Sequence, residues 1–142
     1  MEMDVCEAKK CALPWVTNMR CLIVDDSADF RDAASAMLER AGISVVGKAS
    51  NSAEALRYYE DLHPDVALVD IDLGGEDGFA LAELLDRVSA TSTTLAVILV
   101  STYAESDLEE MINASPAVGF LQKFSLSPDA IRELAERHRA SR

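Results

Sequence analysis

Apolar and polar residues follow two alternating patterns along the chain from residue 20 onward. One pattern is a short, continuous apolar run, which predicts a buried strand. Five such runs lie near residues 20–25, 43–48, 65–70, 94–100 and 117–121. Because these runs do not alternate between apolar and polar positions, we expect both faces of the sheet to be covered, as in parallel sheets.

The segments between these runs carry apolar residues at helical spacing. They predict helices near 28–41, 52–61 and 78–89, a short fourth helix around Leu108 to Ile112, and a fifth that begins at Ser127-Pro128-Asp129. Right-handed helical crossovers are the usual connections between parallel strands. The pattern therefore predicts an α/β doubly wound (βα)5 fold with a five-stranded parallel sheet. Among the common strand orders for such a sheet we expect the flavodoxin-like order 2-1-3-4-5.

Residues 1–18 do not follow the alternating pattern, so we interpret them as an N-terminal extension. Three alternatives remain open: a flexible, disordered segment, a segment docked on the domain through Leu13, Pro14 and Trp15, and an extension that results from an upstream choice of start codon. Residues 19–142 are the length of one ordinary globular domain. We therefore expect a single compact domain after the extension.

Composition narrows the classes of partner. The chain has 25 acidic and 13 basic residues and a net charge of -12, which argues against direct binding to nucleic acids or anionic membranes. No apolar run approaches the roughly 20 residues that a bilayer requires, and the N-terminus lacks the basic start of a signal peptide. We predict a cytoplasmic location.

Acidic residues stand where two of the predicted strands end. Asp25 and Asp26 follow the first strand, and Asp70 ends the third. In the order 2-1-3-4-5 these strands are neighbours, and ligands bind beyond the carboxyl ends of such strands. Carboxylates about 4 Å apart repel by about 4 kcal/mol per pair at an effective dielectric of about 20. Protonation or a cation must offset this, and a cluster of hard oxygens suits Mg²⁺.

Two further polar residues stand at later strand ends. Ser101 follows the fourth apolar run and Lys123 follows the fifth. All of these groups are expected at one edge of the sheet. A hydroxyl and an ammonium beside a metal-binding acid cluster form a suitable site for a phosphoryl group.

Over residues 20 to about 139 the chain resembles the receiver domains of two-component response regulators. The matching segments are Leu22-Ile23-Val24-Asp25-Asp26-Ser27, Pro64-Asp65-Val66-Ala67-Leu68-Val69-Asp70, Asp77-Gly78, Val97-Ile98-Leu99-Val100-Ser101 and Gly119-Phe120-Leu121-Gln122-Lys123. The resemblance implies that residues 19–142 form a response regulator receiver domain in a phosphorelay. Asp70 would be the phosphoacceptor, and a sensor histidine kinase or phosphotransfer protein would be the donor.

The resemblance also assigns roles around Asp70. It implies that Ser101 and Lys123 bind the phosphoryl oxygens. The metal, Mg²⁺ or Mn²⁺, would be held by Asp25, Asp26, Asp70 and the backbone carbonyl of Asp72. Such a domain is a self-phosphorylating phosphoacceptor with slow autodephosphorylation rather than a turnover enzyme.

A conformational switch is implied as well. Ser101 would move toward the phosphoryl group, and Phe120, at the aromatic switch position, would turn inward. The surface of the fourth helix, fifth strand and fifth helix would then bind a downstream protein or a second copy of the chain. Asp72 and Tyr103 are expected to flank the phosphoryl group and to set its lifetime.

Two departures from the family pattern lie near the site. Phe124 follows Lys123 where the family usually has proline, so we expect a trans peptide and a reshaped loop there. Gly74-Gly75 replaces a frequent proline four residues after the phosphoacceptor, which predicts a more mobile loop.

Two alternatives remain open at this point. The departures are compatible with a degenerate receiver that binds partners without phosphorylation. Asp70-Ile71-Asp72 also resembles the Asp-x-Asp motif of haloacid dehalogenase-like phosphatases. In those enzymes, however, the motif ends the first strand, whereas here it ends the third predicted strand.

Overall fold

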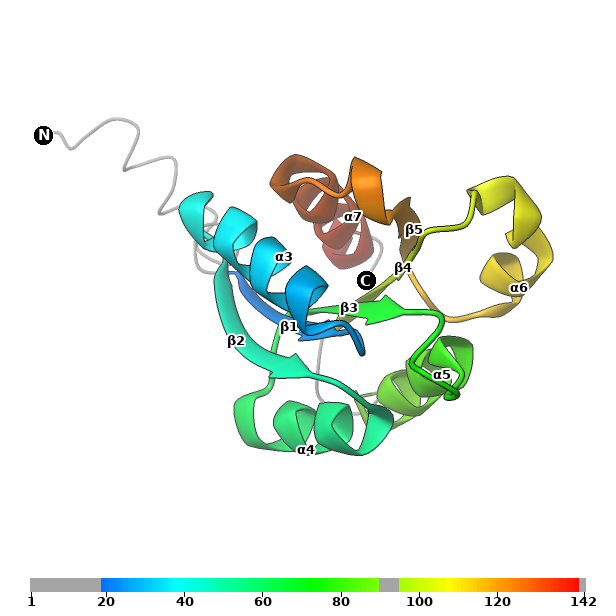
Figure 1. The fold of residues 1–142 in the computed structure, drawn as a ribbon, viewed down its shortest axis with the longest axis horizontal. Helices are drawn as coiled ribbons and strands as arrows, with labels where there is room; N and C mark the ends of the chain where they lie inside the picture. Colours follow the sequence, from blue (N-terminus) through cyan, green and yellow to red (C-terminus); the bar gives the residue numbers. More distant parts are fainter. Residues whose placement is uncertain (1–18, 90–94, 141–142) are drawn as a thin grey trace, which may run out of the picture.

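The computed structural model describes residues 19–89 and 95–140, and the predicted extension over residues 1–18 lies outside them. Within the described ranges, strands and helices alternate as expected (Figure 1). The strands are β1 (Arg20–Val24), β2 (Ser44–Ala49), β3 (Val66–Asp70), β4 (Ala96–Ser101) and β5 (Gly119–Gln122). The α-helices are α3 (Ala28–Arg40), α4 (Ser52–Leu62), α5 (Gly78–Ser89), α6 (Glu109–Ala114) and α7 (Pro128–Ala140). Short 3-10 turns precede α6 and α7, at η1 (Glu105–Asp107) and η2 (Lys123–Ser125).

All strand pairs in the sheet are parallel, and the strand order is β2-β1-β3-β4-β5. The predicted doubly wound fold and its order 2-1-3-4-5 are therefore confirmed. Val24 pairs with Val69, so β1 and β3 end side by side. This register brings the residues that follow β1 close to Asp70 at the end of β3.

Helices cover both faces of the sheet, as the continuous apolar runs predict (Figure 1). On one face, α3 and α7 pack on a cluster that includes Ile23 and Ile98. On the other, α4 and α5 pack on a cluster that includes Leu22 and Leu99. Each of these four strand side chains is fully buried, and burying such a side chain contributes about 1.5–3 kcal/mol. Neighbouring residues of one strand thus belong to opposite cores.

Helix starts follow local capping chemistry. The Ser27 hydroxyl accepts a hydrogen bond from the Phe30 amide at 3.2 Å, which caps the first turn of α3. At α7, the Ser127 hydroxyl accepts from the Ala130 amide at 3.1 Å, and Pro128 takes the first helical position. The predicted start of the fifth helix is confirmed. None of the described helices is long and apolar enough to cross a membrane.

Candidate functional site at the carboxyl edge of the sheet

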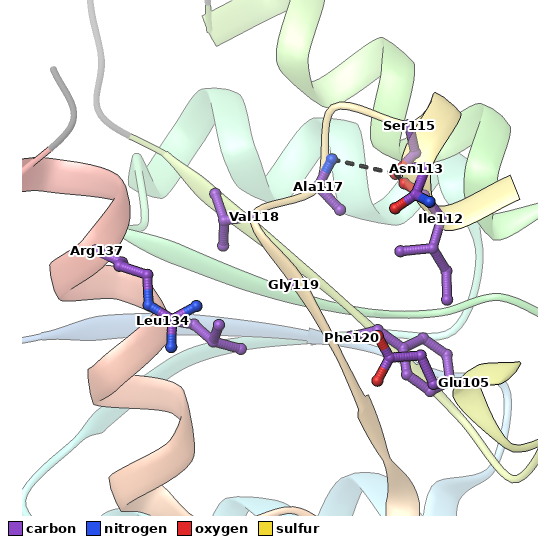
Figure 2. Close-up of a pocket in the computed structure, with 10 residues that line it drawn as sticks. All are labelled: Glu105, Ile112, Asn113, Ser115, Ala117, Val118, Gly119, Phe120, Leu134 and Arg137. Carbon is purple, nitrogen blue, oxygen red and sulfur yellow. Dashed lines mark hydrogen bonds between the residues drawn. The ribbon is translucent and has the colours of Figure 1, made fainter. Parts of the chain in front are cut away.

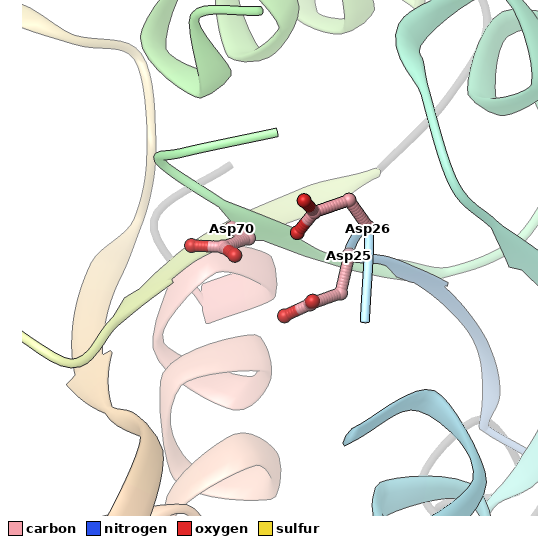
Figure 3. Close-up of side chains that lie close together, drawn as sticks. All are labelled: Asp25, Asp26 and Asp70. Carbon is pink, nitrogen blue, oxygen red and sulfur yellow. The ribbon is translucent and has the colours of Figure 1, made fainter. Parts of the chain in front are cut away.

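Three carboxylates converge where β1 and β3 end (Figure 3). One oxygen each from Asp25, Asp26 and Asp70 lies within 4.8 Å of the others. Asp25 and Asp70 are buried, with 0% and 6% exposure, whereas Asp26 is open to solvent. The cluster therefore has two buried oxygen donors and one side that water can reach.

Lys123 extends from the end of β5 into this cluster. Its Nζ lies 2.7 Å from Asp25 Oδ2 and 3.2 Å from Asp70 Oδ2. The described residues contain no cis peptide bond, so the trans peptide expected between Lys123 and Phe124 is present. The loop is a 3-10 turn at Lys123–Ser125. Although Phe124 replaces the proline that is usual in the family, the Lys123 ammonium still contacts both acids.

The protonation of Asp70 reflects its surroundings. Burial raises the pKa of Asp70 to about 6, and the charge on Asp25 adds to this effect. The Asp72 amide, which donates to Asp70 Oδ1 at 3.2 Å, and the Lys123 ammonium act in the opposite direction. Burial alone lowers the pKa of Lys123, but its close contact with Asp25 and the charge on Asp70 outweigh burial and raise it. Lys123 therefore carries its positive charge at neutral pH.

Ser101 is the last residue of β4 and is 1% exposed. Its Oγ accepts a hydrogen bond from the Tyr103 amide at 2.9 Å, which leaves the hydroxyl proton available for donation. Strand pairing places Val100, its neighbour in sequence, opposite Asp70. Tyr103 itself is 58% exposed and lies outside the core.

The loop after Asp70 is a hydrogen-bonded turn rather than an open segment. The Leu73 amide donates to the Glu76 carbonyl at 3.1 Å, and Asp72 pairs with Asp77 in an isolated antiparallel bridge. Gly74 and Gly75 both have positive φ, at 63° and 104°, where residues with side chains are strained. A Cβ at Gly74 would lie only 2.8 Å from Asp26 Oδ2. A side chain at Gly74 would therefore displace the exposed Asp26 carboxylate and strain the backbone.

Phe120 lies on β5 and is 9% exposed, within the cluster covered by α4 and α5. It also lines a groove of about 440 Å³ between α6, β5 and α7 (Figure 2). Ile112, Leu134 and Arg137 line the same groove from the two helices. The residue at the expected switch position thus lies between the interior and the groove.

The donor atoms of the cluster fit a hard divalent cation. All three side chains offer carboxylate oxygens, and the described residues around them add no thiol or imidazole to the group. Three acids outnumber the one ammonium at the site, so a net negative charge remains for a cation to balance. An exposed Asp26 leaves room for the water ligands that Mg²⁺ retains.

Two residues at the site carry no distinctive signal in the sequence. Phe30 reads as part of the apolar face of α3, yet its ring centroid lies 4.5 Å from Lys123 Nζ. Arg31, one residue later, donates to the Asp25 backbone carbonyl at 2.6 Å. Only the packing of α3 against the sheet edge brings these side chains to the site.

Comparison with known proteins identifies relatives of this chain. A protein-glutamate methylesterase/protein-glutamine glutaminase of Halobacterium salinarum is 36% identical over 90 residues, which are 63% of this chain and 26% of that protein. The protein of the same description from Archaeoglobus fulgidus is 37% identical over 93 residues, 66% of this chain and 27% of that protein. The chain therefore matches about a quarter of the length of these relatives.

Solved structures share the whole fold. A CheY-like response regulator receiver domain protein from Methanospirillum hungatei has a TM-score of 0.74 and 25% identity, over 88% of this chain and 99% of that one. The chemotaxis protein CheY4 of Vibrio cholerae has a TM-score of 0.71 and 25% identity, over 84% and 98%. The family described as response regulator receiver domain matches residues 21–136. The chain belongs to the response regulator receiver domain family.

Proposed function

We propose that Asp70 accepts a phosphoryl group from the phosphohistidine of a sensor histidine kinase or a phosphotransfer protein. The observation that carries the proposal is the surroundings of Asp70. Its buried carboxylate belongs to a cluster of three acids that could hold a metal ion, and it lies 3.2 Å from the Lys123 ammonium. We assign the metal, Mg²⁺ or Mn²⁺, to Asp25, Asp26, Asp70 and the backbone carbonyl of Asp72.

The reaction follows from this chemistry. A carboxylate oxygen of Asp70 attacks phosphorus, the bond from phosphorus to the imidazole nitrogen breaks, and an acyl phosphate forms. The loose transition state of phosphoryl transfer requires in-line positioning and charge neutralisation rather than a dedicated base. Lys123 and the Ser101 hydroxyl would bind the phosphoryl oxygens. A bound Mg²⁺ would neutralise part of the remaining charge.

The signal would pass from Ser101 to Phe120. Ser101 lies on β4 beside β5, where its partner in the sheet is Gln122, two residues after Phe120. Movement of Ser101 toward the phosphoryl group would open space for the ring to turn inward. This would reshape the groove between α6, β5 and α7, the surface that we assign to a downstream protein or to a second copy of the chain.

Tyr103 and Asp72 are proposed to set the lifetime of the phosphoryl group. In this proposal the ring of Tyr103 shields the acyl phosphate from water, while Asp72 adds negative charge near it. The hydrogen bond from the Tyr103 amide to Ser101 Oγ and the exposure of the Tyr103 side chain support this role. Tyr103→Ala is expected to change the autodephosphorylation rate measured after removal of the donor. An unchanged rate would exclude this role.

The two alternative functions, a degenerate receiver and a phosphatase, predict different experimental results from the proposed phosphoacceptor. A degenerate receiver would bind partners without taking up a phosphoryl group. The contacts of Lys123 with two of the three clustered acids support an active receiver instead. A haloacid dehalogenase-like phosphatase would turn over a small phosphoester. Asp70 ends β3, not β1, which disfavours that enzyme class. Sustained turnover of p-nitrophenyl phosphate would restore it.

Acetyl phosphate tests the proposal directly. With Mg²⁺ present, intact-mass spectrometry should show the gain of one phosphoryl group, and both EDTA and Asp70→Asn should abolish the gain. Asp77→Asn is the matched control, because this nearby acid caps the first turn of α5 through the Phe79 amide and lies outside the cluster. No gain in the wild-type chain, or an equal gain in Asp70→Asn, would overturn the proposal.

A further inference from the structure

We propose that Phe30 is a positioning residue whose ring face holds the ammonium of Lys123 in place for phosphoryl binding. This inference rests on the proposed function, because it concerns the group that we assign to the phosphoryl oxygens. It gives a residue of α3 a direct role beside the acids and the lysine at the strand ends.

The contact has the geometry of a cation–π interaction. Lys123 Nζ lies 4.5 Å from the centroid of the Phe30 ring, inside the limit of about 6 Å for such contacts. The Lys123 side chain is only 20% exposed. Partial removal from water strengthens the attraction between an ammonium and a ring face.

The position of the ring is linked to the acid cluster by a closed series of contacts. The Ser27 amide donates to Asp25 Oδ1 at 2.8 Å, and the Ser27 hydroxyl accepts from the Phe30 amide at 3.2 Å. The Phe30 ring faces Lys123 Nζ, which returns to Asp25 Oδ2 at 2.7 Å. The same aspartate therefore places both the helix start that carries the ring and the ammonium that the ring contacts.

Metal binding makes the ring contact important. Within residues 19–89 and 95–140, the ammonium contacts Asp25, Asp70 and Phe30, and the two acids are also the proposed metal ligands. A divalent cation would compete with Lys123 for their oxygens and repel its charge. The neutral ring binds no metal, so its contact with the long, flexible lysine side chain persists. Phe30 would thus keep the ammonium at the site when the acids are engaged.

Binding of beryllofluoride, a phosphoryl mimic, tests this role. In the presence of Mg²⁺, calorimetry should show that Phe30→Leu weakens binding by about three- to tenfold, the range typical of one cation–π contact. Phe30→Tyr keeps the ring and should remain within about twofold of wild type. Phe79→Leu is the matched control, because that ring packs on the cluster at the other face of the sheet.

A double-mutant cycle separates positioning from general packing. If the ring acts through the ammonium, Phe30→Leu should change affinity by less than about twofold in a Lys123→Met background. An equal loss in both backgrounds would show that the ring only supports α3. Unchanged affinity in the single variant would also overturn the inference.

One readout needs no phosphoryl chemistry. Protons above a ring face move upfield in proton NMR, so the ε-methylene protons of Lys123 should move downfield in Phe30→Leu and stay in place in Phe30→Tyr. The measurement is made without metal or mimic. If the wild-type chain bound no beryllofluoride, the proposed function would fail while this contact could still be detected. If the Lys123 ε-methylene protons showed no chemical-shift change in Phe30→Leu, the inference would fail even in a chain that accepts a phosphoryl group.

Discussion

At the scale of single residues, Asp70 combines two opposing requirements. Burial suits the nucleophile that we propose here, but it raises the pKa of the carboxyl from 3.8 to about 6. The folded chain therefore binds this proton more tightly than the unfolded chain does. As pH rises from about 4 to about 6, the unfolded carboxyl ionises first, so folding of the metal-free chain loses stability over that range.

Asp70→Asn should therefore stabilise the metal-free chain at pH 7.5, because it removes a buried charge. The expected gain is about 1–2 kcal/mol, after allowance for water at the open side of the cluster. Urea unfolding in EDTA at pH 7.5 and pH 4 measures it. The gain should largely disappear at pH 4, where the wild-type carboxyl is protonated in the folded chain. A gain that is equal at both pH values would contradict this origin.

The role of Gly74, beside the acid cluster, is steric. Gly74→Ala should weaken Mg²⁺ binding by about tenfold, since the added Cβ would lie 2.8 Å from Asp26 Oδ2 and displace that carboxylate. Calorimetric titration with Mg²⁺ gives the affinity. Gly75→Ala is the matched control, because its φ of 104° is strained as well but its added Cβ meets nothing within 4 Å. Equal losses in the two variants would assign the effect to backbone strain.

At the scale of elements, the start of α5 is packed directly against the end of β3. A Cβ at Gly78 would lie 2.1 Å from the Asp70 carbonyl oxygen and 2.6 Å from Ile71 Cα. These are backbone atoms, which cannot yield without moving the strand end. Gly78 therefore allows close contact between the start of α5 and the end of β3. This contact supports the backbone of Asp70, the proposed phosphoacceptor.

Gly78→Ala is expected to destabilise the chain by about 1–3 kcal/mol through overpacking and to slow phosphorylation by acetyl phosphate. Urea unfolding and intact-mass spectrometry measure the two effects. Ala80→Gly, at an exposed position of the same helix, provides a contrast, because it costs only helix propensity of about 1 kcal/mol and should leave the phosphorylation rate unchanged. Normal stability and rate in Gly78→Ala would contradict the contact.

At the scale of the whole molecule, the site and the groove lie on neighbouring strands. Ser101 ends β4, and Phe120 lies on the adjacent strand β5 and lines the groove with residues of α6 and α7. Packed strands transmit discrete rearrangements because the core between them has little free space. This arrangement supports our proposal that the groove responds to phosphorylation of Asp70 without direct contact.

Ser101→Ala should separate phosphoryl binding from this response. Beryllofluoride should still bind the variant, but the amide chemical-shift changes at groove residues such as Ile112 and Leu134 should become much smaller than in wild type. Proton–nitrogen NMR spectra record both. Ser89→Ala, a buried serine on α5 that donates to the Asp86 carbonyl, should leave the groove response intact. A full groove response in Ser101→Ala would exclude the proposed route.

The pattern of apolar runs alone determined the fold class and showed that acids follow the first strand and end the third, whereas the order 2-1-3-4-5 was expected only as one of the common orders for such a sheet. Local sequence carries this information because strand and helix periods and helix caps depend on near neighbours. The starts of α3 and α7, for example, follow from Ser27 and Ser127. The prominence of Asp25, Asp26 and Asp70 likewise follows from their positions after apolar runs.

Tertiary structure alone decided which side chains and backbone segments contact these acids and the lysine beside them. The reach of Lys123 depends on the 3-10 turn after β5, and the contact of Phe30 with its ammonium depends on how α3 packs on the sheet. The fit of Gly74 against Asp26 depends on a turn closed from both sides. Each is a contact between residues far apart in sequence, and such contacts leave no periodic pattern because they depend on distances set only when the elements pack together.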